Sequence, residues 1–129
     1  GDSTDMHALF VALARAVNIP ARFQMGVTIS SPSSGLLDKS NRHGWAEFYA
    51  EPYGWVPVDI ASAWQNQDNK EYYFGSLDPD RLLISGGQYL RLSPSHVGPT
   101  INVMGGPAIE INYGVPVEQF EFTRQYKNI

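Results

Sequence analysis

The chain begins with its one long helical pattern, and strand patterns follow it. Apolar residues recur at helical spacing between Thr4 and Val17, which predicts a helix with one side buried; they are Met6, Leu9, Phe10, Leu13 and Val17. Asp2 and Ser3 are residue types that cap helix N-termini, and Asn18-Ile19-Pro20 supplies a stop. The sequence therefore marks both ends of this helix.

Several segments after the helix have strand patterns with turn signals between them. The expected strands cover residues 21–29, 43–50, 55–59, 81–84, 88–92, 109–113 and 120–126. Ser85-Gly86-Gly87 predicts a tight turn between 81–84 and 88–92, whereas Ser30 to Asn41, rich in Ser, Pro and Gly, predicts a loop. One helix followed by largely antiparallel strands predicts an α+β fold.

Length and charge narrow the functional classes. A chain of 129 residues with 43% hydrophobic residues can bury one sizeable core, so we expect residues 1–129 to form a single domain. Its formal net charge of -4 argues against nucleic acid or an anionic membrane surface as a partner. No apolar stretch approaches the roughly 20 residues of a membrane span. The absence of cysteine excludes disulfides and thiolate metal sites, but it does not decide the cellular compartment.

Three polar residues stand in the order of a catalytic triad: Ser3, His43 and Asp59. A hydroxyl at a helix N-terminus feels the positive end of the helix dipole and can meet an imidazole held by a carboxylate. An antiparallel register centred on Glu51 places His43 and Asp59 directly opposite each other on one face, whereas a register centred on Pro52-Tyr53 does not. Either residue alone is an ordinary polar residue at a strand end, but the combination with Ser3 favours a site.

The other histidines have weaker claims to a site. His7 lies one helical turn after Ser3, where a packed or solvated role is favoured, and His96 lies in an expected loop. No pair of histidines or carboxylates has metal-ligand spacing, so we predict neither a metal nor a cofactor. A dense aromatic set between Trp45 and Phe74 suggests a cleft wall, although core packing is its default explanation.

Three segments of the chain carry a family resemblance. They are GDSTDMHALFVALARAVNIPARF from Gly1 to Phe23, HGWAEFY from His43 with GWVPVD ending at Asp59, and YYFGSLD from Tyr72. In this order and spacing they resemble the nucleophile segment, the His and Asp segments and a following stretch of bacterial members of the transglutaminase-like superfamily. The resemblance implies a papain-like α+β core, in which an N-terminal helix carries the nucleophile against a largely antiparallel sheet that carries His and Asp.

The resemblance also implies a reaction. It implies acyl transfer or amide hydrolysis on a protein or peptide substrate through a covalent acyl-enzyme, with His43 as base and acid and Asp59 as its orienter. In the family a cysteine stands at the position of Ser3. A serine has no thiolate form, and a site shaped around sulfur holds the smaller oxygen too far from His43, so we expect near-inactivity. We also expect the chain to be the C-terminal part of a longer protein, whose upstream residues complete an oxyanion hole.

Two alternatives stay open. One is a non-catalytic module that keeps a papain-like cleft to bind a peptide or to act as a scaffold, which is the better reading of a natural Ser3. The other is a Gly-Asp-Ser-Leu type serine hydrolase, suggested by Gly1-Asp2-Ser3. Its late Asp-x-x-His signature is missing, because Ser93 stands three residues before His96.

Overall fold

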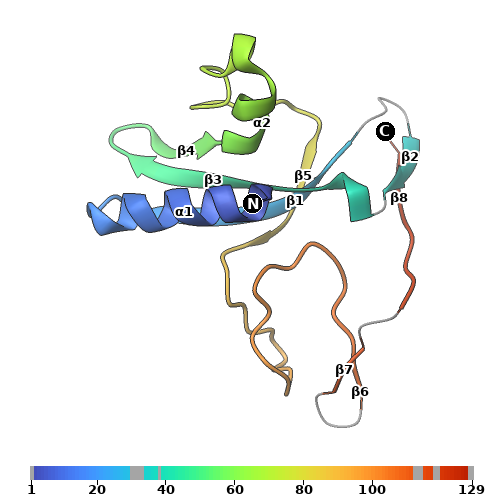
Figure 1. Cartoon of the computed structure of the whole chain (residues 1–129). Helices are drawn as coiled ribbons and strands as arrows, with labels where there is room; N and C mark the ends of the chain where they lie inside the picture. The colour runs from blue at the N-terminus through green and yellow to red at the C-terminus, as the bar shows by residue number, and fades with distance from the viewer. Residues whose placement is uncertain (1, 30–33, 38, 112–114, 118–119, 128–129) are drawn as a thin grey trace.

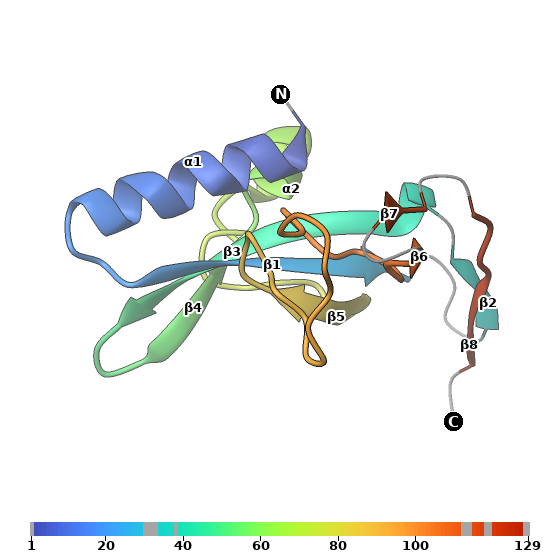
Figure 2. The same ribbon diagram turned by 90° about the horizontal axis from the view of Figure 1, so that it is seen from below.

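One helix lies along a four-stranded antiparallel sheet, as Figures 1 and 2 show in two views. The computed structural model describes residues 2–29, 34–37, 39–111, 115–117 and 120–127. Helix α1 (Ser3–Ala16) precedes a sheet with the strand order β4-β3-β1-β5. Its strands are β1 (Ala21–Thr28), β3 (Arg42–Ala50), β4 (Gly54–Val58) and β5 (Arg81–Gly86), and each neighbouring pair is antiparallel. The predicted α+β class is confirmed.

Both ends of α1 follow the sequence signals. Asp2 is the N-cap: its side chain accepts hydrogen bonds from the backbone N–H groups of Thr4 and Asp5, and Asp5 completes a capping box. Asn18 adopts a positive φ of 62° just after the helix, as a residue that terminates a helix often does. Because Asp2 does the capping, Ser3 is the first helical residue, with no capping role in this box.

The buried side of α1 differs from the predicted apolar stripe. His7, Val11 and Ala14 are buried, and the core beneath α1 includes Phe23, Met25 and Ala46. Gly44 leaves room for this packing, because a Cβ there would lie 2.7 Å from Cζ of Phe23.

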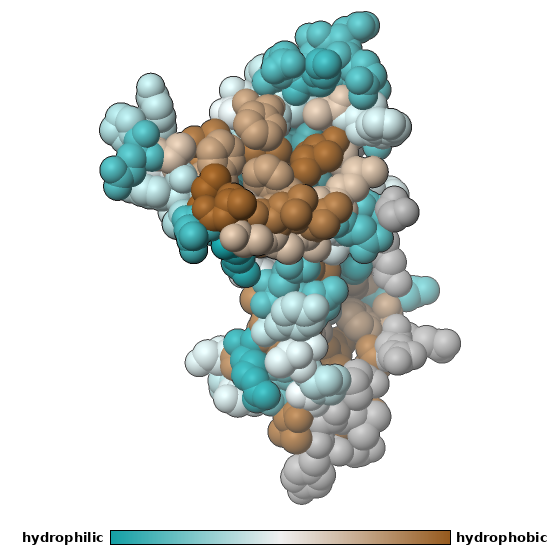
Figure 3. Space-filling model, turned by 60° about the vertical axis from the view of Figure 1, so that its left-hand side comes forward, coloured by the Kyte–Doolittle hydropathy of each residue, from teal (hydrophilic) through white to brown (hydrophobic). Residues whose placement is uncertain are grey.

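Three residues of the predicted stripe instead reach the surface, whereas Phe10 packs against the core. Leu9, Leu13 and Val17 are at least 60% exposed. Leu13 and Val17 border an apolar depression of about 420 Å³, on the side of the molecule that Figure 3 brings forward. Its other lining residues include Phe10, Phe48 and Phe74. Helical periodicity shows that an apolar stripe exists, but it does not show which side the sheet covers.

The remaining elements are short. They are η1 (Lys39–Asn41), α2 (Ile60–Gln65), η2 (Gln67–Asn69) and two small sheets, which pair β2 (Ser34–Leu37) with β8 (Arg124–Lys127) and β6 (Glu110–Ile111) with β7 (Val115–Pro116). The expected loop from Ser30 to Asn41 therefore contains a strand, with residues 30–33 and 38 outside the described part. Of the expected strand 109–113, residues 112 and 113 also lie outside the described part.

The expected hairpin around Ser85-Gly86-Gly87 does not form. The backbone N–H of Gly87 donates to the carbonyl of Phe23, so the chain stays beside β1 instead of turning back. Leu90, from the expected second strand, forms an isolated bridge with Ile101. Among the described residues, no helix is long and apolar enough to cross a membrane.

Candidate functional site

His43 and Asp59 are in direct contact where β3 begins and β4 ends. His43 is the second residue of β3, and Asp59 follows the last residue of β4 and is the N-cap of α2. The β3–β4 register pairs Ala46 with Val58 and Ala50 with Gly54, so it is centred on Pro52 and not on Glu51. The two residues are therefore not directly opposite. The side chains still meet, because His43 Nε2 lies 2.6 Å from Asp59 Oδ2.

Asp59 is fully buried, and several donors surround its carboxylate. Besides His43, Oδ2 accepts hydrogen bonds from Ser62 Oγ at 2.7 Å and Arg81 Nη1 at 2.5 Å. Oδ1 accepts the backbone N–H of Ser62 at 2.9 Å, which caps α2. Burial by itself would raise the pKa of Asp59, but the hydrogen bonds from His43 and from the backbone of Ser62 hold this pKa well below its usual range. Asp59 is therefore an anion at neutral pH.

Arg81 is the cation closest to this carboxylate. It lies at the start of β5, is only 6% exposed, and binds Asp59 through Nη1 and Asp78 through Nε and Nη2. Burial alone would lower the pKa of Arg81, but its hydrogen bonds to Asp78 and Asp59 raise it. The same guanidinium lowers the pKa of Asp78 through hydrogen bonding.

His7 links the start of α1 to the start of α2. Its ring is fully buried; Nε2 accepts the backbone N–H of Ile60 at 2.9 Å, and Nδ1 lies 2.5 Å from the carbonyl oxygen of Ser3. An amide N–H can only donate, so Nε2 bears a lone pair and Nδ1 donates its proton to Ser3. Of the packed and solvated roles favoured for His7, the packed one is observed. With Nε2 occupied in this way, we regard its 3.5 Å approach to Asp59 Oδ1 as a proximity and not as an ion pair.

Ser3 and His43 border the same surface depression, of about 330 Å³, between the start of α1 and α2. Its other lining residues are Asp2, Met6, Ala61, Trp64 and Gln65. Within the described residues no hydrogen bond joins the Ser3 hydroxyl to the His43 ring. The structure thus brings the three sequence-predicted residues into one region, with a close contact between His43 and Asp59 and an open space beside Ser3.

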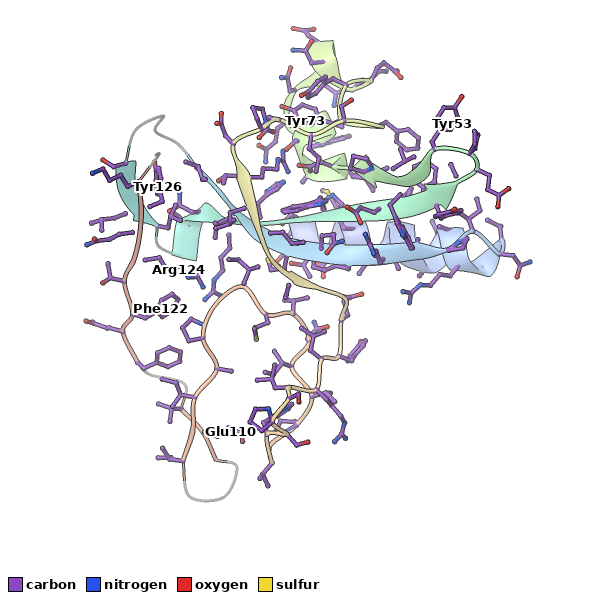
Figure 4. The ribbon with its side chains drawn as sticks, turned by 180° about the vertical axis from the view of Figure 1, so that it is seen from behind. Tyr53, Tyr73, Glu110, Phe122, Arg124 and Tyr126 are labelled. Atoms are coloured by element: carbon purple, nitrogen blue, oxygen red, sulfur yellow. The ribbon has the colours of Figure 1, made fainter. Side chains whose placement is uncertain are left out.

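The aromatic set does not form one cleft wall. Trp64, 72% exposed, borders the depression at Ser3, whereas Phe48 and Phe74 pack against each other at 5.9 Å beside the apolar depression near α1. Figure 4 shows Tyr53 at the tip of the β3–β4 turn and Tyr73 on the side of α2.

His96 belongs to a distant segment. It accepts the backbone N–H of Leu92 and contacts the carbonyl of Pro99. In the part of the chain that the structure describes, no group of three or more His, Cys, Asp or Glu residues could hold a metal ion.

The sequence reasoning missed Ser62, Arg81 and Asp78. Asp59-Ile60-Ala61-Ser62 follows a helix-start pattern, which could have predicted the cap but not the second bond from the serine hydroxyl. Asp78 and Arg81 are three residues apart, which suggests a local ion pair, yet nothing local signals that Arg81 also reaches Asp59.

The lowered pKa values of Asp59 and Asp78 predict how stability depends on pH. A carboxyl whose pKa is lower in the folded chain stabilises the fold above its unfolded pKa of about 3.9, and this stability is lost as the pH falls toward the folded value. We expect the free energy of unfolding to fall below about pH 4. In Asp78→Asn the fall between pH 5 and pH 2 should be shallower, while Asp68→Asn, a change on the exposed surface, should keep the parent profile. Urea unfolding at stepped pH measures this, and equal slopes in both variants and the parent would contradict it.

The first part of the chain is similar to a known protein family. Residues 1–60 match the family model of the transglutaminase-like superfamily, which confirms the resemblance over the segment that contains Ser3, His43 and Asp59. The chain is also 29% identical to an uncharacterized protein of Haemophilus influenzae over 150 aligned positions, covering 94% of this chain. The chain spans about 40% of the length of that relative. No solved structure matches at a significant level.

Proposed function

We propose that this transglutaminase-like domain is built for acyl transfer or amide hydrolysis on a protein or peptide substrate, with residue 3, His43 and Asp59 as its catalytic groups. The observation that carries the proposal is the contact between His43 Nε2 and the buried Asp59 carboxylate, beside the depression that Ser3 also borders. A buried carboxylate that binds one ring nitrogen fixes the tautomer of an imidazole and leaves the other nitrogen to work as a base.

The roles of the three residues follow from this arrangement. Since Nε2 of His43 donates to Asp59, Nδ1 bears the lone pair of the neutral ring and takes the proton from the nucleophile. The nucleophile forms a bond to the carbonyl carbon of an amide, and His43 returns the proton to the departing amine or ammonia. Water or a second amine then attacks the acyl-enzyme. Water gives hydrolysis and an amine gives transfer.

Ser3 limits this chemistry in the chain as it stands. The resemblance implies a cysteine at this position, and a thiol near a helix N-terminus and an imidazole can lose its proton at neutral pH. A serine must give its proton directly to His43 during attack, and the described residues show no hydrogen bond from the Ser3 hydroxyl to that ring. We therefore propose that the domain is nearly inactive with Ser3 and that a cysteine restores the reaction.

A module that binds without catalysis is the second candidate. Ser3 in place of a cysteine favours it, and so does the absence, among the described residues, of a hydrogen bond from the Ser3 hydroxyl to His43. Such a module would use the depression at the start of α1 to hold a peptide without forming a covalent bond to it.

Acyl-enzyme formation distinguishes the two candidates. Ser3→Cys in the full-length protein is incubated with a glutamine-bearing peptide, and intact mass spectrometry detects the peptide mass less ammonia on the protein. We expect acylation about 10³-fold faster than with Ser3, by analogy with removal of single triad members. Ser76→Cys, a thiol at an exposed serine outside the site, is the matched control. Adding a primary amine should then release the acyl group as an amide if transfer is possible.

Acylation of Ser3→Cys no faster than of Ser76→Cys would contradict the catalytic proposal. Retained, saturable and non-covalent binding of the peptide would then support the binding module.

A further inference from the structure

Arg81 binds the same carboxylate oxygen as His43. Oδ2 of Asp59 lies 2.6 Å from His43 Nε2 and 2.5 Å from Arg81 Nη1. The imidazole and the guanidinium therefore share one acceptor atom. A cation at this position reduces the negative potential that Asp59 presents to His43, since charges a few ångströms apart in a buried site interact strongly.

Asp78 holds the opposite side of the same guanidinium. Nε of Arg81 lies 3.1 Å from both carboxylate oxygens of Asp78, and Nη2 lies 2.6 Å from Oδ2. This fork geometry is specific to arginine, because lysine has a single ammonium group. Asp78 thus fixes the orientation of the guanidinium. Its negative charge also partly offsets the positive charge of Arg81.

Arg81 comes from a part of the fold distant from the other members of the site. It begins β5, which stands at the end of the sheet order opposite to β4, whereas Asp59 directly follows β4. The guanidinium carbon lies 5.7 Å from the centre of the Trp45 ring, which is itself buried. Arg81 and Asp78 also lie after residue 60, where the family match ends.

The charged and titratable groups around His43 come from several elements. Helix α1 contributes His7, whose ring centre is 6.5 Å away, and Asp2 at the shared depression. Asp59 approaches from the start of α2, and Arg81 stands behind it with Asp78. With His7 neutral, the sum over Asp59, Arg81 and Asp78 is one negative charge, enough to balance one imidazolium.

We propose that Arg81 and Asp78 are positioning residues that fix the Asp59 carboxylate and set how strongly it attracts a proton to His43. The inference rests on the proposed pairing of His43 with Asp59 as working groups. It gives a role in the site to residues that follow the family-matched segment. Arg81 weakens the electrostatic attraction between Asp59 and the imidazolium, and Asp78 partly cancels this effect of Arg81. The two residues therefore act on His43 with opposite signs.

NMR titration of the His43 ring tests this opposition in the chain as it stands, with Ser3 in place. In Arg81→Gln the repelling cation is lost, and we expect the midpoint of the His43 titration to rise by about one pH unit at low salt. In Asp78→Asn the guanidinium loses its second anion, and the midpoint should fall by roughly half as much. Arg81→Lys keeps the charge without the fork, so its midpoint should stay nearer to the parent than that of Arg81→Gln.

A matched control comes from a second arginine–carboxylate pair of the sheet. Arg22 binds Glu47, and Arg22→Gln should leave the His43 titration unchanged. Shifts of the same sign in Arg81→Gln and Asp78→Asn, or no shift in either, would overturn the proposal. If Arg81→Gln does not fold, Asp78→Asn and Arg81→Lys decide alone: a fall in the first with a smaller change in the second supports the proposal, and any other result overturns it. These outcomes do not depend on acylation, so the proposed reaction can fail separately.

Discussion

Replacing Asp59 with alanine is expected to destabilise the fold by about 3–5 kcal/mol, because it removes one partner of a buried ion pair. The side chain is fully buried, and the loss leaves Arg81, 6% exposed, without its partner at that side. It also removes the cap of α2, since Asp59 Oδ1 accepts the backbone N–H of Ser62. A typical domain has a free energy of unfolding of about 5–15 kcal/mol, so this single change consumes a large share of it.

Urea unfolding at pH 7 measures this effect, with two comparison variants. Asp59→Asn keeps the size of the side chain and an oxygen for the helix cap, so it should cost less than Asp59→Ala. Asp68→Ala changes an exposed aspartate and should stay within about 0.5 kcal/mol of the parent. A loss below about 1 kcal/mol in Asp59→Ala would mean that this carboxylate does not hold its neighbours as described.

Sequence patterns correctly predicted the features that depend on neighbouring residues in the chain. The two ends of α1 follow from Asp2 and Asn18, and the α+β class follows from one helical pattern before several strand patterns. The shared parity of His43 and Asp59 indicated one face of a sheet, and their side chains do meet. The even spacing of these two residues did not determine the register of β3 and β4, which is centred on Pro52.

Contacts between distant segments could not be predicted in this way. Arg81 lies 22 residues after Asp59 and reaches it through the order of strands in the sheet, which periodicity does not reveal. The exposure of Leu9, Leu13 and Val17 was not predicted either, because the apolar pattern does not show which side of α1 meets the sheet. A packed or solvated role was predicted for His7, but its link between Ser3 and Ile60 depends on where α2 begins.

The reactivity of a thiol at position 3 tests most directly whether Ser3, His43 and Asp59 form one nucleophilic site. The rate of alkylation of Ser3→Cys by iodoacetamide is measured from pH 5 to pH 9, beside Ser76→Cys as an ordinary exposed thiol. An ordinary thiol with a pKa of about 8.5 is more than 99% protonated at pH 6 and reacts slowly there. We predict that Ser3→Cys is alkylated rapidly at pH 6, and that adding His43→Ala removes this reactivity. A profile that follows Ser76→Cys and does not change with His43→Ala would contradict the account and favour a module that only binds.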